Sequence, residues 1–560
     1  MQMGVTKMQE LASIRDAASC RDWLLSLDLP MAERAERIEQ LFDALDSGSN
    51  AAADTGEIQT AEILEQARLP YLQALNENLR LLADDPLPFP LPAPAWATLS
   101  RSVDSLRRLR ELYRRIDGNS EVTVIDAPSG PMRRLRERAA QTLQSVLPLM
   151  RALDCQCRLI HALLLFQVHV EQQEWATLAD LAAQARATTF LDAPLPDQLP
   201  IVKNASARSL FVSTLLLRAA RIDTHDPYQR ALIDRMARHW SGRVGFRIDE
   251  GAHLHSNRNG PTIVLNDQLA VRLDTQSLLR KLDERCQSLR NGTGIARGLP
   301  RGMGRSKAVK LLDALRVVWG AAEPPALAGT PVNCAAAMHM GLPNFLAHSA
   351  ASSAAMELPA AAMAYDYGRY EQDTLIRQSS KLGRDTPHLL AQLHANLIEQ
   401  AEPVDWLTRN GNDARIERCH NSAIGHNVLL VLHARQQPVP AHVALPDRAA
   451  IWLGRLTGME QYAQVDRAGR RVQRLSVNLW SIPATVGAMR LSQSALFEPV
   501  YYLPALDGCG ASVFLPPGCW RPLTSARLRL PDQEWTVTLE HAIEQGPGYE
   551  RVLLSGFTDE

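Results

Sequence analysis

The chain has 560 residues, of which 46% are hydrophobic and 22% are charged. Such a length exceeds what one hydrophobic core usually organises, so several domains are expected, and the hydrophobic content excludes a largely disordered chain. Sixty basic and 61 acidic side chains give a formal net charge of -1, which excludes a long-range attraction to nucleic acid or anionic lipid.

The first part of the chain has the periodicity of helices. Apolar side chains recur every three or four positions over residues 60–82, which predicts an amphipathic helix. Prolines at alternate positions over residues 86–94 predict an extended connector. Because short turns join the helices that follow, we expect an all-α helical bundle of TPR-like helix pairs over residues 1–240. The further helices are predicted over residues 99–116, 132–170, 175–187, 205–222 and 227–240.

The arginines of this region are interleaved with leucine at helical spacing. This pattern favours solvated helix faces over a nucleic-acid patch, and no nucleic-acid partner is predicted. The arginines fall in two clusters, Arg107, Arg108, Arg110, Arg114 and Arg115, and then Arg133, Arg134, Arg136 and Arg138.

A mixed connecting region is predicted over residues 241–322. Short apolar pieces around Phe246 and over residues 263–265 are separated by glycine, asparagine and histidine, and helices are predicted over residues 275–289 and 307–319. Between these two helices, residues 290–305 are rich in glycine and arginine, which is typical of a linker.

Past residue 323 the pattern is largely that of β-strands. Apolar or alternating runs predict strands over residues 413–419, 426–433, 472–479, 526–530 and 535–539, with Pro531 and Asp532 as a hairpin turn. One helix near residues 386–400 is predicted as an insertion. We therefore expect an α+β multidomain protein, in which a β-rich region over residues 323–560, either a barrel or a sandwich, follows the helices.

Nothing in the sequence predicts export or a membrane span. The N-terminus has no basic segment followed by an apolar run, and the most apolar stretch, residues 159–170, is too short to span a bilayer. The sequence predicts a cytoplasmic protein with no membrane span.

A search for catalytic chemistry finds no coherent set of residues. His253 and His255 lack a second cluster to complete a metal site, and Ser422 and Ser555 are not in nucleophile-elbow contexts. No Ser, His and Asp set can be assembled from the sequence. A binding protein with no catalytic residue, no metal and no cofactor is predicted. The alternative to a binding protein is an enzyme whose site the sequence does not reveal.

The most informative loop lies between the strands predicted over residues 413–419 and 426–433. Its small residues Ser422 and Gly425 can present backbone N–H groups and a hydroxyl to a guanine edge or a phosphate. Arg415 and Arg418 stand close enough in sequence to add charge-assisted hydrogen bonds. The alternative is a plain β-turn, in which serine and glycine satisfy turn geometry. The candidate nucleotide-binding residues are Arg415, Arg418, His420, Asn421, Ser422 and Gly425.

At this loop the chain resembles the PilZ family of β-barrels. That family binds cyclic-di-GMP through an R-x-x-x-R arm and a D/N-x-S-x-x-G motif, and His420-x-Ser422-x-x-Gly425 is similar to the second motif in degenerate form. Other segments are similar to large bacterial PilZ-containing effectors linked to type IV pili and surface motility: residues 63–68 with the proline connector, residues 225–240, the helix that ends at Trp319, and Leu515-Pro516-Pro517-Gly518-x-Trp520.

The resemblance implies a PilZ-like β-barrel over residues 323–560, a cyclic-di-GMP ligand and an unidentified protein partner. The chain departs from the family at the arm, because residues 324–331 contain no arginine. Arg297, Arg301 and Arg305 form a conceivable substitute arm. Two functions follow: a cyclic-di-GMP-responsive effector or adaptor in motility or surface signalling, or a PilZ-derived interaction scaffold that has lost nucleotide binding.

Overall fold

The computed structural model divides the chain into two compact units, Met1–Ala326 and Leu327–Glu560. The structure describes residues 14–27, 29–46, 57–84, 89–116, 131–186, 206–250, 259–266, 269–292, 299, 303–321, 330–340, 402–420, 424, 428–434, 450–491, 498–505, 510–530 and 533–559. No helix within these ranges is both long enough and apolar enough to cross a membrane.

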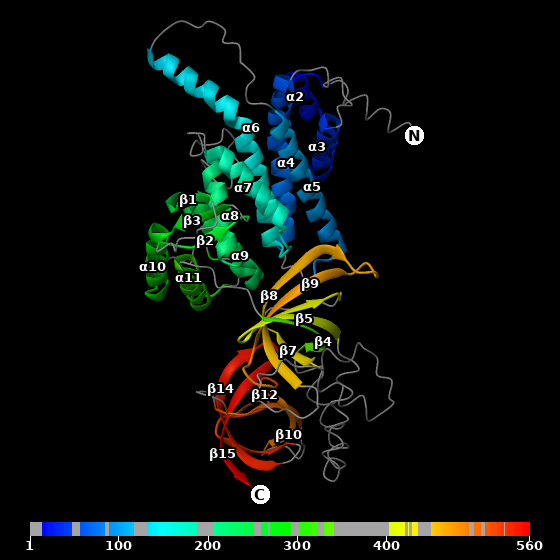
Figure 1. Cartoon of the computed structure of the whole chain (residues 1–560), viewed down its shortest axis with the longest axis vertical. Helices are drawn as coiled ribbons and strands as arrows, with labels where there is room; N and C mark the ends of the chain where they lie inside the picture. The colour runs from blue at the N-terminus through cyan, green and yellow to red at the C-terminus, as the bar shows by residue number, and fades with distance from the viewer. Residues whose placement is uncertain are drawn as a thin grey trace. The chain divides into compact units, whose positions relative to one another are not determined.

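The first unit is mainly helical, as predicted (Figure 1). Apolar side chains of its described helices form one continuous core, in which Leu41, Leu64, Leu106, Leu153 and Leu216 are fully buried. The helices are α2 (Ala17–Ser26), α3 (Met31–Asp46), α4 (Glu57–Asp84), α5 (Ala93–Arg115), α6 (Pro131–Leu165), α7 (Gln172–Arg186), α8 (Ala207–Ala219) and α9 (Pro227–Trp240).

Helix boundaries follow local chemistry that the periodicity alone misses. Helix α5 begins at Ala93, before the predicted residue 99, because Pro94 lies in the first turn, where proline's missing N–H costs nothing. Helix α9 begins at the predicted residue because Asp226 caps it: the Asp226 carboxylate accepts from the Gln229 N–H at 2.9 Å, and Gln229 Oε1 accepts from the Asp226 N–H at 3.1 Å. Helices α2 and α3 had no sequence prediction.

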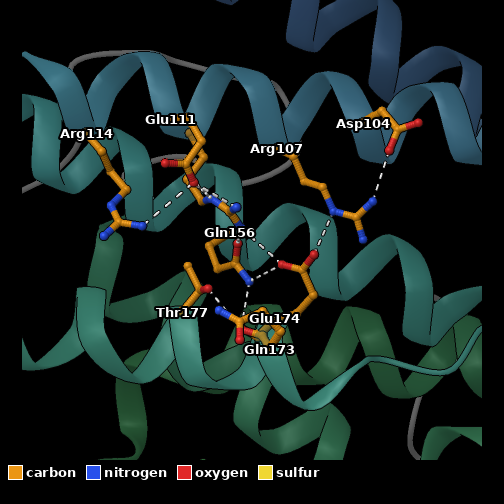
Figure 2. A network of polar contacts seen from close by, with 9 residues as sticks. Asp104, Arg107, Glu111, Arg114, Gln156, Gln173, Glu174 and Thr177 are labelled. Carbon is orange, nitrogen blue, oxygen red and sulfur yellow. Dashed lines mark hydrogen bonds and ion pairs between the residues drawn. The ribbon is translucent and has the colours of Figure 1, made fainter.

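A polar network joins α5, α6 and α7 (Figure 2). The carboxylate of Glu174 on α7 accepts from Arg107 Nε at 2.6 Å, Arg110 Nη1 at 3.0 Å and Gln156 Nε2 at 3.0 Å. Arg110 is 9% exposed, so this arginine does not lie on a solvated face, in contrast to the prediction for its cluster. The side chains of the second arginine cluster lie outside the described part of the chain.

A small sheet and two helices complete the first unit. The strands β1 (Gly245–Glu250), β2 (Thr262–Val264) and β3 (Leu269–Asp274) pair antiparallel in the order β1-β3-β2. Helix α10 (Gln276–Arg290) and helix α11 (Arg305–Gly320) follow. The buried indole of Trp319 donates to the Leu216 carbonyl at 3.0 Å, which ties α11 to α8.

Six described strands of the second unit close into a barrel, which we call barrel 1. Its strands are antiparallel neighbours in the order β4-β5-β6-β9-β8-β7. They are β4 (Thr330–Met340), β5 (Glu402–Asn410), β6 (Asp413–Arg418), β7 (Leu429–Ala434), β8 (Ala450–Val465) and β9 (Arg471–Leu479). The strands predicted over residues 413–419, 426–433 and 472–479 are β6, β7 and β9.

The next six described strands close into barrel 2 (Figure 1). Its order is β10-β11-β12-β15-β14-β13, again antiparallel throughout. The strands are β10 (Thr485–Leu491), β11 (Glu498–Leu503), β12 (Ser512–Leu515), β13 (Thr524–Arg529), β14 (Glu534–Gly546) and β15 (Tyr549–Asp559).

The two barrels share a hydrophobic core. Leu429, Val431, Ile451 and Leu453 of barrel 1 pack in one cluster with Tyr501, Phe514 and Tyr549 of barrel 2, all of them buried. The backbone supports this junction, since the Ala484 N–H donates to the Ile451 carbonyl at 2.7 Å. The second unit is therefore two barrels joined by packed side chains.

The predicted α+β multidomain class is confirmed, with a helical region before a barrel region. The sequence did not predict that the described strands between residues 330 and 559 build two barrels. The helix predicted near residues 386–400 and the turn at Pro531 and Asp532 lie outside the described residues.

Candidate functional site

The structure places three of the six predicted nucleotide-binding residues. Arg415 and Arg418 lie on β6, and His420 follows the strand. Asn421, Ser422 and Gly425 lie outside the described residues. The described part of the predicted site is therefore the end of barrel 1 at which the predicted loop begins.

Arg415 and Arg418 lie on opposite faces of β6. Side chains alternate along a strand, and Ala414, Ile416 and Arg418 are buried on the inner face of barrel 1, whereas Arg415 is half-buried on the other face. The structure thus does not bring the two guanidinium groups together, although they are close in sequence.

Hydrogen bonds to several polar groups hold Arg418 inside barrel 1. Its Nε donates to Gln473 Oε1 at 2.8 Å, its Nη1 to Glu402 Oε2 at 3.2 Å, and its Nη2 to the carbonyl of His420 at 3.3 Å. Burial lowers the pKa of Arg418, and the Glu402 carboxylate partly offsets this effect. Two of these partners, Glu402 and Gln473, were not among the predicted site residues.

Gln473 also binds the residue that begins the loop. Its Nε2 donates to the His420 carbonyl at 2.5 Å, so this oxygen accepts from both Gln473 and Arg418. Gln473 lies opposite Arg418 on the neighbouring strand β9 and is fully buried. Gln473 could have been found from the sequence, because it is a polar residue at an inward position of the alternating run over residues 472–479.

Glu402, at the start of β5, completes this cluster. Its Oε2 lies 4.0 Å from His420 Nδ1, and its buried Oε1 has no hydrogen-bond partner within the described residues. Burial raises the pKa of Glu402, against the lowering influence of Arg418 and His420. His420 leaves nearly half of its side chain exposed, so its imidazole can contact a ligand, whereas the side chains of Arg418 and Gln473 are buried.

The first unit contains a Ser, His and Asp arrangement that the sequence did not reveal. Ser213 Oγ lies 3.3 Å from His161 Nε2, and His161 Nδ1 lies 3.5 Å from Asp234 Oδ1. Ser213 is fully buried in α8, and its hydroxyl donates to the Leu210 carbonyl at 2.8 Å. A nucleophile needs access to its substrate, and the buried Ser213 hydroxyl has none. The geometry therefore favours a structural polar contact between α6, α8 and α9.

This buried histidine predicts a loss of stability in acid. Burial lowers the pKa of His161. For Asp234, burial raises the pKa, but Arg238 and the contact with His161 outweigh burial and lower it to about 2. Because the unfolded chain binds the His161 proton more readily, stability falls as the pH drops through the unfolded pKa of about 6.5. We expect the free energy of unfolding, from urea titrations followed by circular dichroism, to fall less steeply between pH 7.5 and 5.5 in His161→Gln than in the wild type.

The exposed His239 on α9 provides the control. His239→Gln should leave the pH dependence unchanged, and equal slopes for the wild type and His161→Gln would contradict the assignment.

Comparison with known families concerns the helical region. Residues 18–250 match the family model "Cyclic-di-GMP receptor FimW, N-terminal domain". The helical region is similar to this receptor domain. The resemblance to cyclic-di-GMP effectors that the sequence predicted is thus confirmed for the first unit, and the match ends with β1. The PilZ likeness of the barrels stays a prediction. No curated protein and no solved structure matches the chain.

Proposed function

We propose that this chain is a non-catalytic, cyclic-di-GMP-responsive effector or adaptor of bacterial surface signalling or motility, acting in the cytoplasm. The observation that carries the proposal is the match of residues 18–250 to the N-terminal domain of a cyclic-di-GMP receptor. Ligand binding in the second unit would alter how the chain engages a protein partner.

The nucleotide site that we propose is the loop end of barrel 1. His420 stands half-exposed at the end of β6, where its imidazole can meet a guanine edge or a phosphate. Ser422 and Gly425 supply the hydroxyl and backbone N–H groups of the degenerate motif, with Asn421 as a neighbouring amide. Arg415, on the outer face of the strand, supplies a charge-assisted hydrogen bond to a phosphate.

A second candidate function is an interaction scaffold that no longer binds nucleotide. Two observations favour it: residues 324–331 contain no arginine, and Arg418 is already bound to groups inside barrel 1. Of the conceivable substitute arm, Arg297 and Arg301 lie outside the described residues, and Arg305 begins α11.

Calorimetric titration of the full chain with cyclic-di-GMP separates the two functions. We expect binding on the order of 1 µM for the effector. Ser422→Ala should weaken it about tenfold or more, since a hydrogen bond to a charged group contributes about 1.5–3 kcal/mol. Ser525→Ala, at an exposed position of β13, serves as the matched control and should bind like the wild type. Absence of heat at high nucleotide concentration would reject the effector and leave the scaffold.

A further inference from the structure

The two barrels have the same topology. Numbering the described strands of each barrel from one to six in chain order gives the neighbour sequence 1-2-3-6-5-4 in both, from β4-β5-β6-β9-β8-β7 and β10-β11-β12-β15-β14-β13. Two barrels in one chain can share this order by chance, so residue-level agreement is the stronger observation.

Register and sequence agree at the second strand of each barrel. Strands β5 and β11 both begin Glu-Pro-Val. In barrel 1, Met338 pairs with Glu402 and Leu432; in barrel 2, Met489 pairs with Glu498 and Leu528. A shift of one residue would turn every side chain to the other face, so this agreement marks the barrels as repeats of one unit.

The repeats differ where the predicted loop begins. The last residue of β6, Arg418, pairs with Gln473, and the last residue of β12, Leu515, pairs with Glu550. Arg418 and Leu515 are both buried inside their barrels. Barrel 2 therefore closes with a leucine at the position where barrel 1 has a buried arginine, so closing the barrel does not require the arginine.

A buried ion pair is seldom more stabilising than apolar residues of similar size, because both charges lose their hydration. In barrel 1 the arrangement also leaves Glu402 Oε1 buried without a hydrogen-bond partner among the described residues. What the cluster does provide is two donors, Arg418 Nη2 and Gln473 Nε2, to the carbonyl of His420. This contact fixes the backbone at the residue from which the loop departs.

We infer that Glu402, Arg418 and Gln473 are positioning residues, which set the backbone of His420 for ligand binding without touching the ligand themselves. The inference rests on the proposed function of the loop, and it distinguishes barrel 1 as the ligand-binding repeat. Arg418 thereby acts through His420, whereas the sequence analysis had grouped it with Arg415 as a residue that contacts the nucleotide.

The test variant gives barrel 1 the apolar residue of barrel 2. Arg418→Leu combined with Glu402→Gln removes both charges and leaves no unpaired buried ion. The matched control is Arg474→Leu combined with Glu417→Gln, which removes an arginine–carboxylate pair at 3.0 Å from the outer face of β9 and β6. We expect the melting temperature of the test variant to equal or exceed that of the wild type.

Two measurements on the full chain decide the inference. In the test variant, cyclic-di-GMP affinity should fall about tenfold or more, and amide hydrogen exchange should accelerate in peptides that contain Cys419 and His420. The control should change neither quantity. Unchanged exchange in the test variant would overturn the inference.

These measurements distinguish failure of the proposed function from failure of the inference. If the wild type binds no cyclic-di-GMP but exchange accelerates in the test variant alone, the proposed function fails, while the observation that the cluster fixes the His420 backbone stands. If the test variant does not fold, Gln473→Leu removes one donor to the His420 carbonyl and retains the Arg418–Glu402 pair. The same exchange measurement then applies, and an unchanged rate would overturn the inference.

Discussion

Replacing Glu174 with alanine is expected to destabilise the helical unit by about 3–5 kcal/mol, the usual loss when one partner of a buried ion pair is removed. Glu174 on α7 is buried and accepts from Arg107 on α5 and from Gln156 on α6 (Figure 2). Its removal leaves the buried Arg110 without its carboxylate partner on α7. Urea unfolding followed by circular dichroism measures this loss.

Glu111 is the matched control, because it belongs to the same network but is 40% exposed. Glu111→Ala should cost no more than about 1 kcal/mol, as for other exposed pairs. Equal losses for Glu111→Ala and Glu174→Ala would contradict the role of burial.

The Glu174 carboxylate also makes its contribution to the stability of the helical unit sensitive to acid. Burial raises the pKa of Glu174, but hydrogen bonds from Gln156 and Arg107 outweigh burial and lower it overall. A carboxyl whose folded pKa is lowered stabilises the fold above its unfolded pKa and loses that contribution as the pH falls through the folded value. The difference between the wild type and Glu174→Ala should therefore shrink in acid.

The helices could be predicted from the sequence because each buries one apolar stripe in a common core. Residues 227–240 were predicted in full, since Asp226 and Pro227 mark the start of α9 in the sequence itself. Helix α5 was predicted short because a proline in the first helical turn has the same sequence signature as a proline in a connector.

The second barrel escaped prediction because its junction with barrel 1 removes the alternation of apolar and polar residues. Residues 451–454 of β8 are all buried, as are all four residues of β12. A strand buried on both faces gives a continuous apolar run, and such a run does not reveal which face forms the barrel interior.

The candidate site was predicted only in part, for a similar reason. Arg415, Arg418 and His420 lie close together in sequence, so their grouping was visible, but their opposite directions are set by the strand. Glu402 and Gln473 contact Arg418 from 16 and 55 positions away in the chain. The pairing of β6 with β5 on one side and with β9 on the other brings them to it.

Replacing Phe514 with alanine should destabilise the second unit by about 3–5 kcal/mol and weaken the coupling between the barrels. Its ring is buried in the core that the two barrels share, with its centroid 4.8 Å from that of Trp480 and 5.9 Å from that of Tyr549. Since the cavity would open at the junction, amide hydrogen exchange should accelerate in peptides from β7 and β8 of barrel 1 as well as in those from barrel 2.

The neighbouring Leu515 provides the control that isolates coupling from stability. It is also buried, but it belongs to the interior core of barrel 2, so Leu515→Ala should cost about 2–5 kcal/mol and accelerate exchange in barrel 2 alone. If Phe514→Ala likewise left β7 and β8 unaffected, the shared core would not couple the barrels. If both variants accelerated exchange in β7 and β8 equally, the second unit would open as a whole, and the coupling could not be assigned to the junction. The expected contrast follows from alternation along β12, where adjacent side chains serve different cores.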